Sequence, residues 1–164
     1  MGINFSNGAT LSQSSNGAIT TPGRIIQVIN TTSTTAVDTA STSPVDLMTS
    51  NPITLSNANN KILIEFHSDN RCEDWGDGTW NLYYMDLVYV NTNTQISYSG
   101  YRGEYTYSIR HFHKQAIHTP GTIGPHTYKI RGWSYQALTT AFNDPGWTSA
   151  DGIMYIRLME IATT

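Results

Sequence analysis

The sequence is short of charged residues and of long apolar runs. Charged side chains make up 13% of its 164 residues, about half of the 25% that is usual in soluble domains. The formal net charge is -3 and no basic stripe stands out, which argues against a nucleic-acid partner. No apolar run approaches the length of about 18 residues that a membrane span needs, and the N-terminus lacks the pattern of a secretory signal. We therefore expect neither a membrane protein nor a nucleic-acid-binding protein.

Cysteine is also scarce, and enzyme motifs are missing. The single cysteine, Cys72, cannot form a disulfide within the chain, and we interpret it as a structural thiol beside a turn. There is no Gly-x-Ser-x-Gly elbow, no phosphate-binding glycine loop and no His-Glu-x-x-His. A glycoside hydrolase on a β-sandwich would need two carboxylates across a groove, and the sequence shows no sign of one. We expect no enzyme activity and no cofactor.

What the sequence does contain is short strands and many turns. In residues 61–67, Ile62, Ile64 and Phe66 fall on one face while Lys61, Glu65 and His67 fall on the other, which is the period-two pattern of a half-buried strand. Similar segments recur along the chain between Gly, Pro and Asn turn signals, and none has a helical period. About eight to ten strands of this kind predict an all-β fold, an antiparallel two-sheet β-sandwich of jelly-roll type, for residues 24–164.

The strand predicted over residues 80–90 has apolar residues on both faces. The outer face of an antiparallel strand usually meets water, so a second apolar face calls for a second covering layer. We expect this layer to come from neighbouring subunits, and the same reasoning applies to the closing strand over residues 152–161. The residues predicted to contact a neighbouring subunit are Tyr83, Met85, Leu87, Tyr89, Ile156 and Leu158.

Residues 1–23 carry no charged side chain and contain two Asn-Gly turn signals. Asn-Gly is a strong hairpin signal, but this segment has too few apolar residues for a core of its own. Its polar composition is also typical of a disordered leader. We interpret it as a docking arm that attaches to a larger partner, with apolar anchors at Ile3, Phe5, Leu11 and Ile19.

An acidic, aromatic loop is predicted over residues 69–79. Asp69, Asp74 and Asp77 could together bind Ca²⁺, although their spacing matches no known calcium loop and a solvated turn is the simpler interpretation. Aromatic side chains in predicted loops could bind a sugar or anchor an interface. The candidates for an exposed ligand loop are Asp74, Trp75, Asp77, Trp133 and Trp147.

Two histidines, His111 and His113, are two residues apart and would share one face of a strand. Around a threefold axis, three chains would present six imidazoles to one transition metal ion. Surface histidines without a metal are more common, so both interpretations stay open and we assign no metal ion to the chain.

Several segments together resemble the head domain of small virion proteins of tailed phages, especially marine phages. The resemblance extends over roughly residues 23–162. The segments that carry it are residues 23–28, 42–46, 53–56, 60–64, 126–130 and 156–161. It implies a jelly-roll head similar to the trimeric complement and tumour-necrosis-factor heads, without enzyme activity. The acidic loop and the Tyr-rich residues 99–118 are not part of the shared pattern.

Together these observations predict a non-enzymatic virion protein that is assembled in the host cytoplasm. We expect a homotrimeric capsid decoration protein whose N-terminal arm docks on the major capsid protein or another virion protein. The alternative is a tail-fibre or receptor-binding protein that uses its aromatic loops to bind a host surface glycan.

Overall fold

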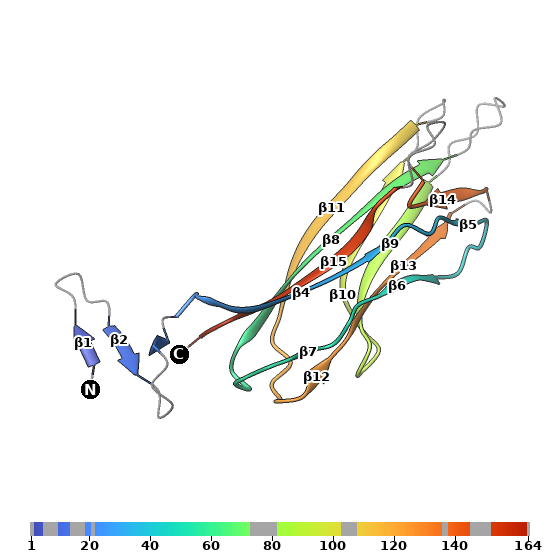
Figure 1. The fold of residues 1–164 in the computed structure, drawn as a ribbon. Coiled ribbons are helices and arrows are strands. Elements are labelled where there is room, and N and C mark those ends of the chain that lie inside the picture. The colour runs from blue at the N-terminus through green and yellow to red at the C-terminus, as the bar shows by residue number, and fades with distance from the viewer. Residues whose placement is uncertain are drawn as a thin grey trace.

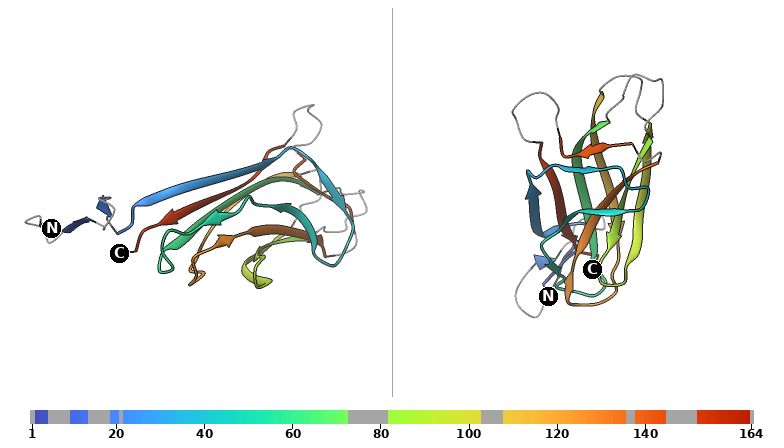
Figure 2. Two further views of the ribbon diagram at one scale, coloured as in Figure 1. Left: turned by 60° about the horizontal axis from the view of Figure 1, so that its bottom comes forward. Right: turned by 90° about the vertical axis from the view of Figure 1, so that its right-hand side faces the viewer.

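The computed structural model shows an all-β chain whose strands form two packed layers (Figures 1 and 2). It describes residues 2–4, 10–13, 19–20, 22–72, 82–102, 108–135, 138–144 and 152–163. Over these residues no helix is long and apolar enough to cross a membrane. The antiparallel two-sheet sandwich expected from the sequence is confirmed.

The larger sheet forms one layer of the sandwich. Its long strands lie in the order β4, β15, β8 and β11, and the short strands β14 and β5 continue it beside the end of β8. Their bounds are Ile25–Ser33 for β4, Met154–Ile161 for β15, Lys61–Cys72 for β8, Ser108–His118 for β11, Thr140–Phe142 for β14 and Val37–Thr39 for β5.

The smaller sheet forms the second layer, in the order β10, β9, β13 and β6. A separate two-stranded pair, β7 with β12, lies at one end. The bounds are Thr94–Arg102 for β10, Leu82–Tyr89 for β9, Tyr128–Ser134 for β13, Val45–Thr49 for β6, Ile53–Thr54 for β7 and Pro125–His126 for β12.

The strand order is that of a jelly roll. The eight long strands in chain order are β4, β6, β8, β9, β10, β11, β13 and β15. The first, eighth, third and sixth of them form one sheet, and the second, seventh, fourth and fifth form the other. This arrangement results when two Greek keys fold over each other, so the predicted jelly-roll topology is confirmed.

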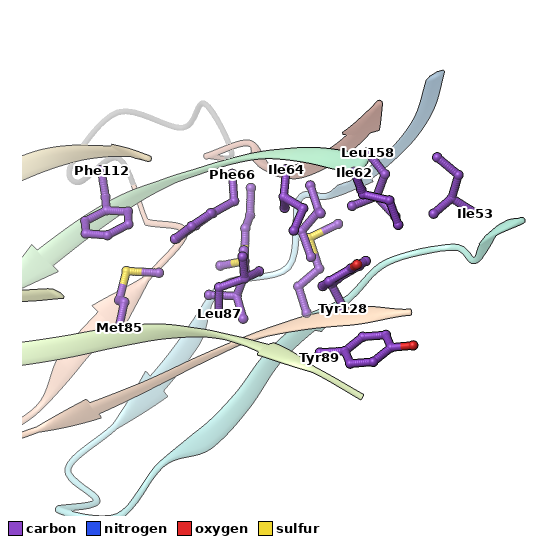
Figure 3. Packing of buried hydrophobic residues seen from close by; sticks show 14 of the residues in the cluster. Ile53, Ile62, Ile64, Phe66, Met85, Leu87, Tyr89, Phe112, Tyr128 and Leu158 are labelled. Atoms are coloured by element: carbon purple, nitrogen blue, oxygen red, sulfur yellow. The ribbon is translucent and has the colours of Figure 1, made fainter. Parts of the chain in front are cut away.

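The hydrophobic core fills the space between the two layers (Figure 3). Ile62, Ile64 and Phe66 point inward from β8, as their alternation predicts, and each is at most 1% exposed. Figure 3 shows Met85 and Leu87 of β9 facing them from the other sheet. Strand geometry places every second residue of both sheets in this core.

Strand β8 is longer than the sequence predicts. It was expected to end at His67, with Asp69 in a loop, but it pairs with β11 without interruption as far as Cys72. Ser68 and Asn70 both face inward and are hydrogen-bonded to each other: the Ser68 hydroxyl donates to Asn70 Oδ1 at 2.6 Å. A buried polar pair that is hydrogen-bonded is tolerated in a strand, and local sequence patterns do not reveal it.

The N-terminal segment forms a small sheet of its own, with strands β1 (Gly2–Asn4), β2 (Thr10–Gln13) and β3 (Ile19–Thr20). These strands pair antiparallel, β1 with β2 and β2 with β3. The head begins beside its own C-terminus: Gly23 N donates to Ala162 O at 2.7 Å, and Ala162 N donates to Arg24 O at 2.9 Å. The left view in Figure 2 shows the three-stranded sheet projecting beyond this end of the head.

A buried carboxylate joins the chain segments at this end. Glu160 of β15 is fully buried, and its side chain accepts hydrogen bonds from Ser56 N and Oγ, Asn60 Nδ2 and Gln27 Nε2, at 2.7–2.8 Å. Burial alone would raise the pKa of Glu160, but hydrogen bonds from Asn60, Ser56 and Gln27 outweigh it and lower that pKa. The ionised carboxylate therefore ties together β4, β15 and the loop before β8.

Candidate functional site

The six residues predicted to contact a neighbouring subunit lie instead in the core of this chain. Each is at most 6% exposed in the single subunit. They occupy the inward-facing positions of β9 and β15, so their side chains meet the opposite sheet and cannot reach a second copy. The residues to which this correction applies are Tyr83, Met85, Leu87, Tyr89, Ile156 and Leu158.

The outward face of β9 is also covered without a second subunit. Val88 is fully buried and Asp86 is 1% exposed. Arg131 of the neighbouring β13 makes a two-pronged ion pair with Asp86, with Nε to Oδ1 at 3.0 Å and Nη2 to Oδ2 at 2.5 Å. Hydrogen bonding to Asp86 raises the pKa of Arg131. Double burial of this strand was correctly predicted, but its attribution to neighbouring subunits was wrong.

Four aromatic rings gather on the outer face of the smaller sheet, and we call them the aromatic cluster: Tyr84, Tyr98, Trp133 and Tyr135. The Tyr84 ring stacks on Tyr98 at 5.4 Å and lies 5.5 Å from Trp133 and 6.0 Å from Tyr135. Trp133, predicted to lie in an exposed loop, is a half-buried residue of β13. Tyr98 and Tyr135 remain 48% and 59% exposed, so the cluster offers aromatic surface to a ligand.

A glycine makes room for the aromatic cluster. Gly100 of β10 lies opposite Tyr84 in the strand pairing. A Cβ atom at position 100 would lie 2.6 Å from Cε1 of Tyr84, which is closer than packed carbon atoms approach. The missing side chain therefore lets the Tyr84 ring lie flat across β10.

An apolar row crosses the outer face of the larger sheet. Val28 of β4 pairs with Met159 of β15, Met159 pairs with Leu63 of β8, and Leu63 pairs with Ile117 of β11. Residues opposite each other in a ladder share a face, so the four side chains run side by side across four strands. We call them, together with the exposed Ile25 and Ile26 of β4, the outer apolar band. Val28 is 45% exposed and Ile117 is 61% exposed.

Polar rows follow the outer apolar band along the same face. In the next row Arg157 of β15 donates to Asn30 of β4 and pairs with Glu65 of β8, which accepts a hydrogen bond from Gln115 of β11. Beyond it, Tyr155, His67 and His113 lie opposite one another on β15, β8 and β11. The band is thus bordered by side chains that prefer water.

Asp69 and His111 form the farthest row, and together with His67 of the row before it they make an imidazole–carboxylate cluster. His111 and His113 share the outer face of β11 as predicted, and within the chain His111 lies against Asp69 and beside His67. Asp69 belongs to β8, not to the predicted acidic loop. Sequence reasoning missed His67, although His67 and Asp69 are two residues apart and would share a face of any strand.

Several predicted residues cannot be placed. Phe5, Asp74, Trp75, Asp77 and Trp147 lie outside the described residues. The backbones of Ile3, Leu11 and Ile19 lie in the small N-terminal sheet, where Ile3 is opposite Leu11. The predicted docking arm and exposed ligand loop therefore stay predictions.

Comparisons with known proteins do not assign the chain to a family. No protein family model matches the sequence, and no curated protein matches it. Among solved structures, the chain is similar to one in "Structure of infectious bursal disease virus Gx strain", with a TM-score of 0.43 and 11% sequence identity. The likeness covers 89% of this chain and 39% of that chain.

Proposed function

We propose that this protein is a non-enzymatic structural protein of a phage virion, a homotrimeric capsid decoration protein that docks through its N-terminal arm. The outer apolar band is the observation that carries the proposal. Its exposed members, Ile25, Ile26 and Val28 on β4 and Ile117 on β11, flank the half-buried Leu63 and the buried Met159. Exposed apolar side chains gathered on one face in this way are typical of an interaction surface. The resemblance to virion heads supports the choice of a virion and of three copies.

The occupant of the band in this proposal is a second copy of the chain. Only 13% of the residues are charged, so few charges would have to be desolvated when two such surfaces meet. The band includes the start of β4, and the arm joins the head just before that strand. Packing copies through this end would bring the arms together, which suits attachment to a single site on a capsid.

Charge placed in the outer apolar band should dissociate the trimer while leaving the subunit folded. We expect the wild-type protein to have three times the 18.2 kDa chain mass at micromolar concentration, and the V28D/I117D variant to be monomeric. Buried unpaired carboxylates at an interface cost several kcal/mol, but in the monomer both positions face water. Analytical ultracentrifugation measures the mass, and circular dichroism checks the fold.

Ile123→Asp is the matched control, because Ile123 is at least as exposed as Val28 and Ile117, at 66%, but lies outside the band. The I123D variant should sediment as a trimer, like the wild type. A wild-type protein that sediments as a monomer would overturn the proposed trimer, and a V28D/I117D variant that stays trimeric would show that another surface holds it.

The aromatic cluster favours a second candidate function, a tail-fibre or receptor-binding protein that recognises a host surface glycan. Stacked rings with exposed faces are suited to the apolar faces of sugars. If this function is correct, the wild-type protein binds components of a glycan array, and Tyr98→Ala and Tyr135→Ala each weaken binding by about tenfold. Tyr155→Ala is the control, since Tyr155 lies on the opposite sheet. Absence of binding to any glycan would count against this candidate.

A further inference from the structure

The imidazole–carboxylate cluster on the outer face of the larger sheet has the geometry of a metal site. His67 Nε2 lies 2.9 Å from Asp69 Oδ1, and His111 Nδ1 lies 2.6 Å from the same oxygen. The three donor atoms all lie within 4.8 Å of one another. They come from two strands only, because His67 and Asp69 share a face of β8 and Asp69 lies directly opposite His111 on β11.

The donor set matches the chemistry of zinc-like ions. Two imidazole nitrogens and one carboxylate oxygen are common ligands of Zn²⁺ and related divalent ions, with bonds of about 2.0–2.2 Å. Donors around a tetrahedral ion are then about 3.3 Å apart. The two nitrogen–oxygen distances in the cluster are shorter than this by less than 1 Å, so a small outward shift of the rings makes room for the ion.

The surrounding residues hold two of the three donors in place. The side chains of His67 and Asp69 are only 22% and 15% exposed. The His67 ring stacks on Tyr155 at 5.4 Å and lies parallel to His111 at 6.3 Å. Asp69 is fixed through its backbone, since its carbonyl oxygen accepts a hydrogen bond from Asp144 N at 2.8 Å. Outer contacts of this kind orient metal ligands.

The third donor is free to adjust. The His111 side chain is 75% exposed, so its ring can turn toward an ion without disturbing the core. The same exposure leaves one side of the cluster open to water, which would supply a fourth ligand.

We propose that His67, Asp69 and His111 bind one divalent transition metal ion of the zinc type. The ion would bind to His67 Nε2, His111 Nδ1 and Asp69 Oδ1. It would displace the protons that these imidazole nitrogens share with the carboxylate. In the described part of the chain β11 pairs with β8 alone, so the ion would fasten an edge strand to the sheet and stabilise the folded head.

The test uses full-length protein without an affinity tag, freed of metal by a chelator. We expect isothermal titration with ZnCl₂ to give one bound ion per chain, and CoCl₂ to give the visible absorption bands of a tetrahedral site. D69N and H111A should each weaken zinc binding at least about tenfold. Both variants keep the backbone pairing, and H111A changes an exposed residue, so it tests the site even if D69N is unstable.

His113→Ala is the matched control. His113 lies on the same strand and the same face as His111 and is also exposed, but it is not one of the three clustered donors. It should bind zinc like the wild type. Failure of the wild type to bind zinc, unchanged binding by D69N and H111A, or an equal loss in H113A would each overturn the assignment and leave an ordinary hydrogen-bonded cluster.

Discussion

Leu87→Ala should lower the free energy of unfolding of the subunit by about 3 kcal/mol, within the range for buried leucines. Leu87 is fully buried and points from β9 toward the larger sheet (Figure 3). Truncating it removes apolar contacts and leaves a cavity that the two packed sheets can close only in part. Urea denaturation of wild type and variant at equal protein concentration measures the difference.

The same variant distinguishes a core residue from an interface residue. If Leu87 faced a neighbouring subunit, its truncation would weaken assembly and spare the subunit. The structure predicts the reverse, with unchanged mass in the ultracentrifuge below the unfolding transition. Ile123→Ala serves as control, because a 66% exposed side chain should change stability by no more than about 0.5 kcal/mol. Loss of mass without loss of subunit stability would contradict the burial described here.

Glu160→Gln should destabilise the head by about 2–4 kcal/mol at neutral pH, because hydrogen bonds to a buried charged group are strong and leaving their donors unpaired is costly. Four donors converge on this carboxylate, and an amide replaces one acceptor oxygen with a competing donor. The substitution thereby loosens the junction between the start of the head and its last strand.

The pH dependence of the unfolding free energy tests whether the ionised carboxylate of Glu160 causes this stabilisation. The pKa of folded Glu160 lies below its ordinary value of 4.5, so its stabilising effect is fully present above about pH 4.5 and is lost as pH falls through the lower folded pKa. The difference in unfolding free energy between wild type and E160Q should therefore shrink as the pH falls below 4.5. Glu65→Gln is the control on the sheet surface, where ion pairs contribute about 1 kcal/mol or less. A difference that stays constant with pH would contradict this role of Glu160.

Local alternation predicted which residues of β8 face the core, but the same reasoning failed on β9. In β8 the polar residues Lys61, Glu65 and His67 mark the outer face, which they share with Leu63. In β9 both faces are apolar, and the pattern alone does not say what covers them. The structure covers the second face with residues of the same chain, because Arg131 on β13 neutralises Asp86 and the rings of Tyr98 and Trp133 pack against Tyr84.

The candidate metal site was likewise only partly predictable, because His111 is distant in the chain from His67 and Asp69. His111 was identified from its spacing to His113, yet its partners are Asp69 and His67. Asp69 is 42 residues away in the chain, and its neighbourhood is decided by the pairing of β8 with β11. The apolar residues of the outer apolar band are likewise spread over four strands, so their alignment was not visible along the chain.

The amino-acid sequence by itself determined the strands, the turns between them and the jelly-roll class, because alternation and turn chemistry act over a few neighbouring residues. Only the tertiary structure decided which apolar faces remain on the surface and which polar side chains meet. Those outcomes depend on strand register, and a register shifted by one residue would turn each strand's side chains to the opposite face.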